Sequence, residues 1–221
     1  PVAEIKLMSE ALQNGDYTIS TEAPVKSSVK EPTTIKATAA KPTEFVIIQN
    51  EEINLKHPAN SNYFKSQEEL STLIMKAVEK GLIQNLYDNN KLNEKISRDE
   101  WNNRLVLETG FLFGDSEESP EFRVTGRSVT VAEVSWKLFF NQKGEVTKAV
   151  PHAISLYIGP EENPMTGMMK HIGTVSFADA EQALNKLPEL KSAANSILSG
   201  LRNRNYFGYV TSTSGISVAN K

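Results

Sequence analysis

SVTVAEVSWKLFFNQKGEVTKAVPHAISLYI, residues 128–158, is the stretch that decides the fold. In its first part, every second side chain is apolar and most of those between are polar. This two-residue period is typical of a strand with one buried face. The apolar members of this alternation are Val134, Trp136, Leu138 and Phe140. Asn-Gln-Lys-Gly at 141–144 has turn composition, and apolar residues of one parity follow to the end of the stretch. The pattern predicts a long antiparallel hairpin, 128–140 with 145–158, at the centre of a sheet, with an edge or a bulge at Pro151 because proline has no N–H to donate.

Helical signals flank this hairpin. Ser66 and Glu69 form a capping box, in which each side chain accepts from an early backbone N–H, and Gly81 is placed to end the helix in a left-handed turn. Helices are predicted over 66–80, 97–105, 176–187 and 188–198, and shorter strands over 45–48, 171–175 and 206–213. The predicted fold class is therefore α+β: an antiparallel or mixed sheet built on the long central hairpin, with helices packed on one side.

Composition divides the chain into parts. In residues 17–44, prolines break helices and central strands, and the few apolar side chains cannot build a core. Ordering each residue costs about 1–2 kcal/mol of backbone entropy, so an extended Pro/Thr/Lys-rich arm needs a surface to hold it, on this chain or on a neighbour. The predicted parts are a short N-terminal helix at 1–16, the arm at 17–44, a single α+β domain at 45–212 and a polar tail at 213–221.

The overall composition excludes several kinds of chemistry. Of the 221 residues, 39% are hydrophobic and 23% charged, as in ordinary soluble globular chains, and the net charge of −3 gives no general attraction to nucleic acid or anionic membranes. Cys is absent, so the chain has no disulfide framework, thiolate metal site or cysteine nucleophile. No apolar run reaches the ~20 residues that span a bilayer, and the first residues lack a signal-peptide pattern. A cytoplasmic or virion location is favoured, and a mature exported protein is compatible with the sequence.

Motifs for catalysis and cofactors are incomplete. Phe113-Gly114-Asp115-Ser116 is similar to the start of the nucleophile block of GDSL-type hydrolases, but no Asp stands three residues before any of the three histidines to complete the base. The phosphate-binding patterns G-x-x-x-x-G-K-[ST] and G-x-G-x-x-G are absent, and the histidines show no metal-ligand spacing. We therefore expect no catalytic residue, cofactor or metal, and a small hydrolase using Ser116 is only the third function considered.

A basic and aromatic patch lies near 202–209. Its members are Arg202, Arg204, Tyr206 and Tyr209. The arginines could neutralise phosphates, and aromatic side chains that alternate on a strand could stack on bases. The alternative is a helix end whose arginines complement the helix dipole, followed by a strand with a buried aromatic face. This patch is the candidate nucleic-acid site.

Apolar side chains in the first helix, the arm and one loop are candidate partner contacts. The helix carries them at helical spacing, and flexible Met side chains in a Pro/Gly-rich loop suit an adaptable contact surface. The candidates are Ile5, Met8, Leu12, Val25, Val29, Ile35, Met165, Met168 and Met169. For the helix and the Met loop, the alternative is packing on the chain's own domain.

One family resemblance starts at Ile53-Asn54-Leu55. Together with the helix from Leu70 to Leu86 and with Tyr87-Asp88, it resembles the N-type gliding-motility and type IX secretion ring proteins. The resemblance implies a component of that apparatus. It extends over a minor part of the chain through common residue types, and the prediction of function does not adopt it.

The sequence as a whole predicts a non-catalytic structural subunit of a homomeric or multi-protein assembly, of capsid, filament or ring type, whose N-terminal arm contacts neighbours. Its partners would be other copies of itself or other assembly subunits. The alternative is a nucleic-acid-binding, nucleocapsid-like protein that uses the basic and aromatic patch, with an affinity that falls steeply with salt.

Overall fold

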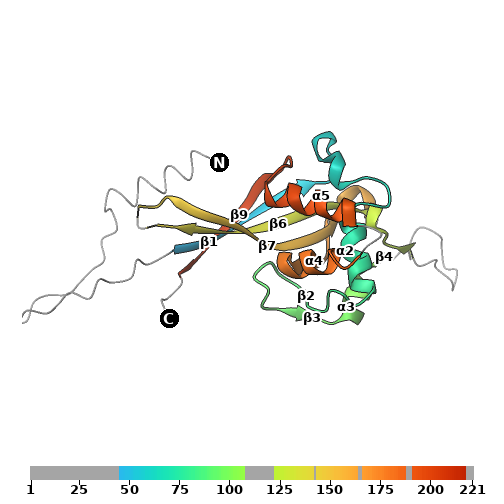
Figure 1. Cartoon of the computed structure of the whole chain (residues 1–221). Helices are drawn as coiled ribbons and strands as arrows, with labels where there is room; N and C mark the ends of the chain where they lie inside the picture. Colours follow the sequence, from blue (N-terminus) through green and yellow to red (C-terminus); the bar gives the residue numbers. More distant parts are fainter. Residues whose placement is uncertain (1–44, 108–121, 142, 164–165, 188–190, 218–221) are drawn as a thin grey trace, which may run out of the picture.

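The computed structural model describes residues 45–107, 122–141, 143–163, 166–187 and 191–217. These residues form a seven-stranded antiparallel sheet and a two-stranded one, with helices packed against the large sheet (Figure 1). The α+β class with an antiparallel sheet is thus confirmed. The predicted first helix and arm lie outside the described residues.

The strand order in the large sheet is β3-β2-β8-β7-β6-β1-β9. Its strands are β1 (Phe45–Asn54), β2 (Leu86–Tyr87), β3 (Lys95–Ile96), β6 (Val129–Phe140), β7 (Val146–Ile158), β8 (Lys170–Ser176) and β9 (Tyr209–Ser217). The small sheet pairs β4 (Val106–Leu107) with β5 (Phe122–Arg123). The helices are α2 (Leu70–Glu79), α3 (Arg98–Arg104), α4 (Phe177–Leu184) and α5 (Lys191–Arg202), and the 3₁₀ turns are η1 (Pro58–Tyr63), η2 (Gly126–Ser128) and η3 (Pro160–Glu162). Both α5 and β9 extend further along the chain than predicted.

The predicted central hairpin is confirmed as the pairing of β6 with β7. Ser135 lies opposite Ala153 and the next residue, Trp136, lies opposite Pro151, so that His152 is the extra residue of a β-bulge. On its other side, β7 pairs with β8 only from Ala153 onward. Pro151 therefore lies at a bulge and beyond the end of the neighbouring strand, where its missing N–H leaves no ladder bond unmade.

The bulge also changes which side chains share a face. Before it, Ala149 lies opposite Leu138 and Val150 lies opposite Lys137. The single parity predicted for the second strand is therefore wrong at Val150. A second irregularity, between Phe139 and Phe140, returns Val146 to the predicted face, where its side chain is 52% exposed. An inserted residue reverses the side chains beyond it as far as the next irregularity, which a simple alternation count does not detect.

The core lies between one face of the large sheet and helices α2, α4 and α5. Ile154, Leu156 and Ile158 of β7 are fully buried on this face. The helices contribute Leu70, Leu73, Ile74, Ala77 and Val78 from α2, Phe177, Ala180, Ala183 and Leu184 from α4, and Ala194, Ile197, Leu198 and Leu201 from α5. Helix α3 adds Trp101, which lies so close over Gly173 of β8 that a Cβ there would be 2.6 Å from two ring carbons. The missing side chain of this glycine makes room for the indole.

Two predicted helix starts and one helix end are confirmed. The hydroxyl of Ser97 accepts from the backbone N–H of Glu100 at 3.0 Å, and that of Ser176 accepts from Asp179 at 2.9 Å. Gly81 follows α2 with φ of +70°, the left-handed conformation that favours glycine. These signals are local, so the sequence is sufficient to find them.

The start of α2 differs from the prediction. The helix begins at Leu70, and its N-cap is Glu69 rather than Ser66. Gln67 has φ of 66°, which breaks the helical path before the cap. The buried carboxylate of Glu69 accepts a hydrogen bond from the Thr72 hydroxyl at 2.7 Å. The predicted capping box is therefore wrong, because the helix starts four residues after Ser66 and the Glu69 carboxylate binds the Thr72 hydroxyl instead.

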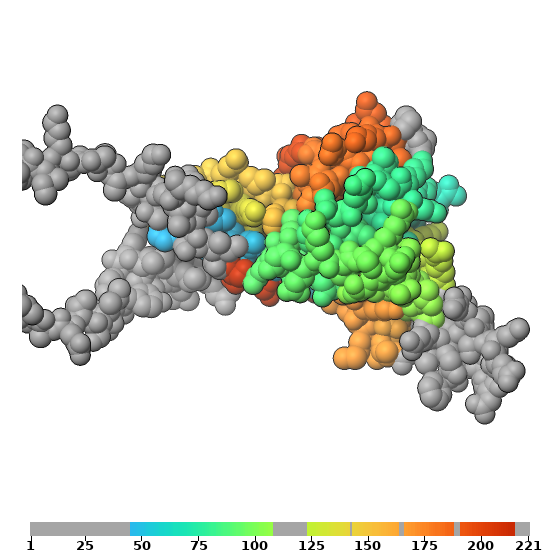
Figure 2. Space-filling model, turned by 90° about the horizontal axis from the view of Figure 1, so that it is seen from below, coloured from blue at the N-terminus to red at the C-terminus, as the bar shows by residue number. Residues whose placement is uncertain are grey.

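The large sheet is longer than the helical layer that covers it. In Figure 1, β1, β6, β7 and β9 continue beyond α4 and α5. Viewed from below, the green and teal residues, which include β2, β3 and α3, spread over the broad end of the molecule (Figure 2). The described body therefore has a broad end that holds the core and a narrow end made of four strands.

Candidate functional site

A polar hollow of about 310 Å³ lies on the face of the sheet opposite the core. Side chains alternate along β7, so Ser155 and Tyr157 point away from the buried Leu156 between them. The hollow is lined by Asp88, Asn89, Asn90, Glu133, Ser155, Tyr157, His171 and Thr174. The first three follow β2, and the other five come from β6, β7 and β8. The sheet order therefore brings together residues that are far apart in the sequence.

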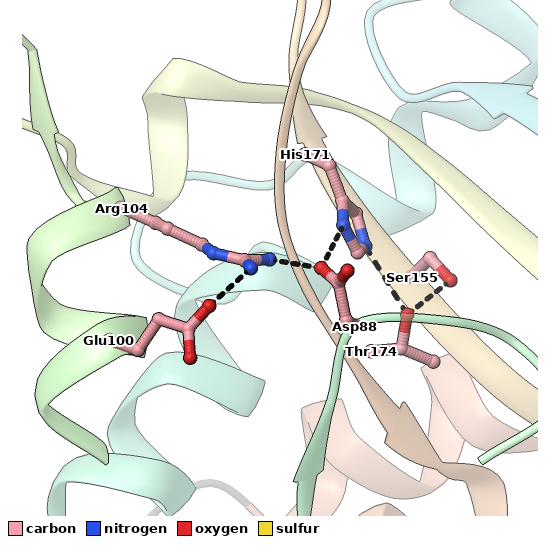
Figure 3. A network of polar contacts seen from close by, with 6 residues as sticks. All are labelled: Asp88, Glu100, Arg104, Ser155, His171 and Thr174. Carbon is pink, nitrogen blue, oxygen red and sulfur yellow. Dashed lines mark hydrogen bonds and ion pairs between the residues drawn. The ribbon is translucent and has the colours of Figure 1, made fainter. Parts of the chain in front are cut away.

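A chain of polar contacts runs from α3 into this hollow (Figure 3). Arg104 donates to Asp88 Oδ1 and to Glu100 Oε1, each at 2.6 Å. The same Asp88 oxygen is 3.6 Å from Nδ1 of His171. Nε2 of His171 is 3.3 Å from the Thr174 hydroxyl, which lies 2.8 Å from that of Ser155. The network ties α3 and the segment after β2 to the middle of the sheet.

The charges in this network depend on Arg104 and on burial. Its hydrogen bond holds the pKa of Asp88 below the ordinary value. Burial, and then the charge of Arg104, lowers the pKa of His171. At neutral pH an ionised Asp88 therefore faces a neutral imidazole. Asp88, His171 and Thr174 follow one another as in a catalytic triad, but Thr174 is fully buried, so its hydroxyl is out of reach of a substrate.

We expect the free energy of unfolding to fall as the pH is lowered from about 6.5 to about 4. Burial, and then the charge of Lys137, lowers the pKa of His152 from 6.5 to about 4. In that interval the unfolded chain binds a proton that the folded chain does not, so acid favours unfolding. Urea unfolding midpoints between pH 7 and pH 4 measure the effect. His152→Asn should flatten this dependence, and an unchanged slope in that variant would contradict the assignment.

The predicted basic and aromatic patch is not an open basic face. Arg202 pairs with Glu181 of α4, and the hydroxyl of Tyr209 donates to Glu52 of β1. The guanidinium of Arg204 lies 4.2 Å from the ring centroid of Trp136. Its positive charge is also 3.5 Å from a carboxylate oxygen of Glu51. The positive charge of each arginine is therefore paired with a carboxylate of the same chain.

Tyr206, the fourth member of that patch, is turned into the protein. Its hydroxyl donates to Glu51 and accepts from Trp136 Nε1 at 3.0 Å. Burial, and then the bond to Glu51, raises the pKa of this phenol. A base could not stack on a ring held in this way.

Two of the candidate partner residues are exposed and the others are outside the described residues. Met168 is 69% exposed and Met169 is 45% exposed. The loop that carries them is held by Asn163, whose amide donates to the backbone oxygen of Met168 at 2.9 Å. Met165 and the candidates in the first helix and arm, namely Ile5, Met8, Leu12, Val25, Val29 and Ile35, lie outside the described residues. Their roles stay predictions.

Sequence reasoning missed an exposed aromatic surface around the start of β9. Phe207 is 58% exposed, Tyr209 57% and Val210 41%. The imidazole of His57 stacks on Phe207, with ring centroids 4.2 Å apart. We call these four residues the aromatic patch. The alternating aromatics were visible in the sequence, but only the position of β9 at the edge of the sheet shows that they remain uncovered.

The buried side chain of Asn60 anchors the backbone segment that carries Phe207. Asn60 is fully buried, and its amide donates to the backbone oxygens of Asn54 and Phe207 at 2.7 and 2.8 Å. Its Oδ1 accepts from the N–H of Phe207 at 2.7 Å. These bonds join η1 to the segment before β9, so the position of the Phe207 backbone is fixed.

The described ranges contain neither a candidate metal site nor a candidate membrane span. No three His, Cys, Asp or Glu side chains there gather so that they could hold a metal ion. None of the helices in this part of the chain has the length and apolar character needed to cross a membrane.

Comparison with protein families identifies the chain. A family described as gliding motility associated protein GldN matches residues 49–215. A comparison with curated proteins gives no match. The GldN family is a non-enzymatic component of the gliding and secretion apparatus, which confirms the prediction that the chain is not an enzyme. The same finding makes the prediction of a capsid or filament subunit, the virion assignment and the nucleic-acid-binding alternative wrong. The chain belongs to the GldN family of gliding motility associated proteins.

Proposed function

We propose that this chain acts by binding another subunit of the gliding and secretion apparatus through the aromatic patch. A single observation carries the proposal: Phe207, Tyr209 and Val210, each more than 40% exposed, follow closely in the sequence at the start of an edge strand, with Tyr209 and Val210 on opposite faces of it. Several exposed large apolar side chains at one place on a folded protein are unfavourable in water, and they often mark a surface that a partner covers.

The arrangement of the patch suits binding. Aromatic residues are enriched at the centres of protein interfaces because they bury much area with few rotatable bonds. The stack of His57 on Phe207 and the bonds of Asn60 to the Phe207 backbone hold this ring in place before a partner arrives. Less side-chain entropy is then lost on binding, so more of the contact energy remains as affinity.

The exposed methionines are a second candidate surface. Met168 is the most exposed large apolar side chain among the described residues, and Met169 lies beside it. Thioether side chains adapt to differently shaped partners. This surface would serve a different subunit from the one at the aromatic patch, and other copies of the chain are also candidate partners.

Replacing Phe207 and Val210 together by serine should weaken partner binding. Truncation of an interface centre costs about 2 kcal/mol or more, roughly 30-fold in affinity. The measurement is gliding speed, and co-purification with the other subunits of the apparatus, in cells whose own copy is replaced by the variant. Because both side chains are exposed, the melting temperature should change little.

Met168→Ser with Met169→Ser is the matched control. It removes two exposed apolar side chains at another place, so a loss there alone would move the proposal to the second surface. Normal gliding and normal co-purification of the Phe207→Ser, Val210→Ser variant would refute the role of the aromatic patch.

A further inference from the structure

We infer that strand β9 pairs with β9 of a second copy of this chain, antiparallel and about a two-fold axis, so that one sheet continues across both copies. The inference goes beyond the proposed function. It concerns the backbone edge of β9 rather than the aromatic patch, and each can hold without the other.

The two edges of the large sheet differ sharply. The β3 edge is two residues long and carries the charge of Lys95. The β9 edge is nine residues long, YVTSTSGIS, with no charged residue and no proline. Within the described part of the chain, β9 pairs with β1 on one side and has no strand on the other. Proteins that remain single protect such edges with charges, prolines or short length, and this edge has none of the three.

The local geometry leaves a regular stretch for pairing. Thr211 is the extra residue of a bulge, because Val210 lies opposite Glu51 while Ser212 lies opposite Asn50. The Thr211 hydroxyl is turned inward, where it donates to the oxygen of Asn50 at 3.3 Å. From Ser212 to the end of β9 the ladder with β1 has no further irregularity. The bulge therefore hinders strand pairing only at the start of this edge, and the backbone from Ser212 onward is available to pair with another strand.

Charge distribution favours a second copy over a charged partner strand. A strand without charges meets no like charge when it lies against itself, and it offers no ion pair to a charged strand. A two-fold axis perpendicular to the sheet brings the same edge of both copies together, and the two strands that it relates run antiparallel. The carboxylates beside β9 are those of Glu51 and Glu52, opposite its first two residues, and that of Glu133, which accepts from the Thr211 hydroxyl at 3.1 Å.

An axis near Ser214, at the middle of the regular stretch, keeps these carboxylates apart. Position 209 in the two copies is then separated by about ten residues along the strands, or roughly 30 Å. A parallel arrangement would place the glutamates of both copies at the same level. The antiparallel register is therefore the one that combines a complete backbone ladder with separated charges.

The absence of cysteine makes a direct test possible. Ser212→Cys, Thr213→Cys and Ser214→Cys are made one at a time in the full chain, with Ser196→Cys on the exposed side of α5 as the matched control. A residue on the axis lies beside the same residue of the second copy, so the two thiols have an effective concentration on the order of millimolar. At roughly 10 μM protein, the disulfide dimer should therefore form about 100-fold faster than in the control. If the axis falls between two residues, the mixed disulfide of two neighbouring variants forms fastest instead. Rates equal to the control for all three variants and their mixtures would overturn the inference.

A second variant keeps the test independent of disulfide chemistry. Ser214→Lys places like charges across the axis while an exposed position on an edge strand tolerates lysine, so the fold should persist. Light scattering should give a dimer mass for the parent chain and a monomer mass for this variant, with equal circular dichroism. A parent chain that is a monomer at every concentration tested would overturn the inference. In that case, loss of co-purification in the Phe207→Ser, Val210→Ser variant would still support the proposed function.

Discussion

Replacing Trp101 by alanine should lower the free energy of unfolding by about 3–5 kcal/mol, the largest effect of any single substitution considered. The indole is 1% exposed and lies against β8, over Gly173. Neither backbone can collapse into the space left behind, because α3 is fixed by the Ser97 cap and by the ion pairs of Arg104 with Asp88 and Glu100. The loss therefore includes the apolar transfer energy and a cavity.

Urea unfolding followed by circular dichroism measures this loss. Trp101→Phe is the control, since it keeps an aromatic ring and should cost less than the alanine variant. Gly173→Ala probes the same contact from the strand, where the new methyl group would meet the indole at 2.6 Å, and overpacking of this kind costs about 1–3 kcal/mol. An alanine variant at Trp101 within 1 kcal/mol of the parent chain would show that α3 does not pack on β8 as described.

Replacing Glu51 by alanine should cost about 2–4 kcal/mol, because it leaves buried polar groups without partners. The carboxylate is 8% exposed and accepts from the Gln49 amide at 2.6 Å and from the Tyr206 hydroxyl. Arg204 also loses its nearest negative charge while it remains stacked on Trp136. The substitution thus breaks the polar cluster that joins the end of α5 to the strands beyond it.

Glu51→Gln separates the charge from the hydrogen bonds. Glutamine keeps one acceptor oxygen of the same shape, so this variant should lose about half as much stability as the alanine variant. The measurement is the urea midpoint at neutral pH. Equal stability of the parent chain and the alanine variant would mean that water replaces the carboxylate without cost, and that the cluster is not closed as described.

The parts of the fold that the sequence predicts are those specified by neighbouring residues. Alternation and a turn identify the β6–β7 hairpin, and the caps at Ser97 and Ser176 depend on a backbone N–H three residues away. Residues 148–150 of β7 were misassigned because the bulged residue His152 reverses the pattern, and a second irregularity beside Phe140 restores it. The start of α2 was misassigned because Gln67 adopts a left-handed conformation that its residue type does not announce.

The candidate sites were harder to predict because their members come together only through the order of strands. Asp88 meets His171 because β2 lies beside β8. The arginines near the C-terminus looked free in the sequence, since their carboxylate partners, Glu51 and Glu181, are distant along the chain. The resemblance in residues 53–88 was a better guide to function than composition, because the matched family region includes it.

The pairing of the first described strand with the last has a consequence for synthesis of the chain. Asn50 and Ser212 are 162 residues apart yet share a hydrogen bond between side chains. Contacts of such large sequence separation close late in folding, so β9 joins a sheet whose other strands have already emerged from the ribosome. Until then β1 is the outer strand, and it carries the negative charges of Glu51 and Glu52. The unfinished protein is thereby protected from edge-to-edge aggregation by charges that the finished edge no longer presents.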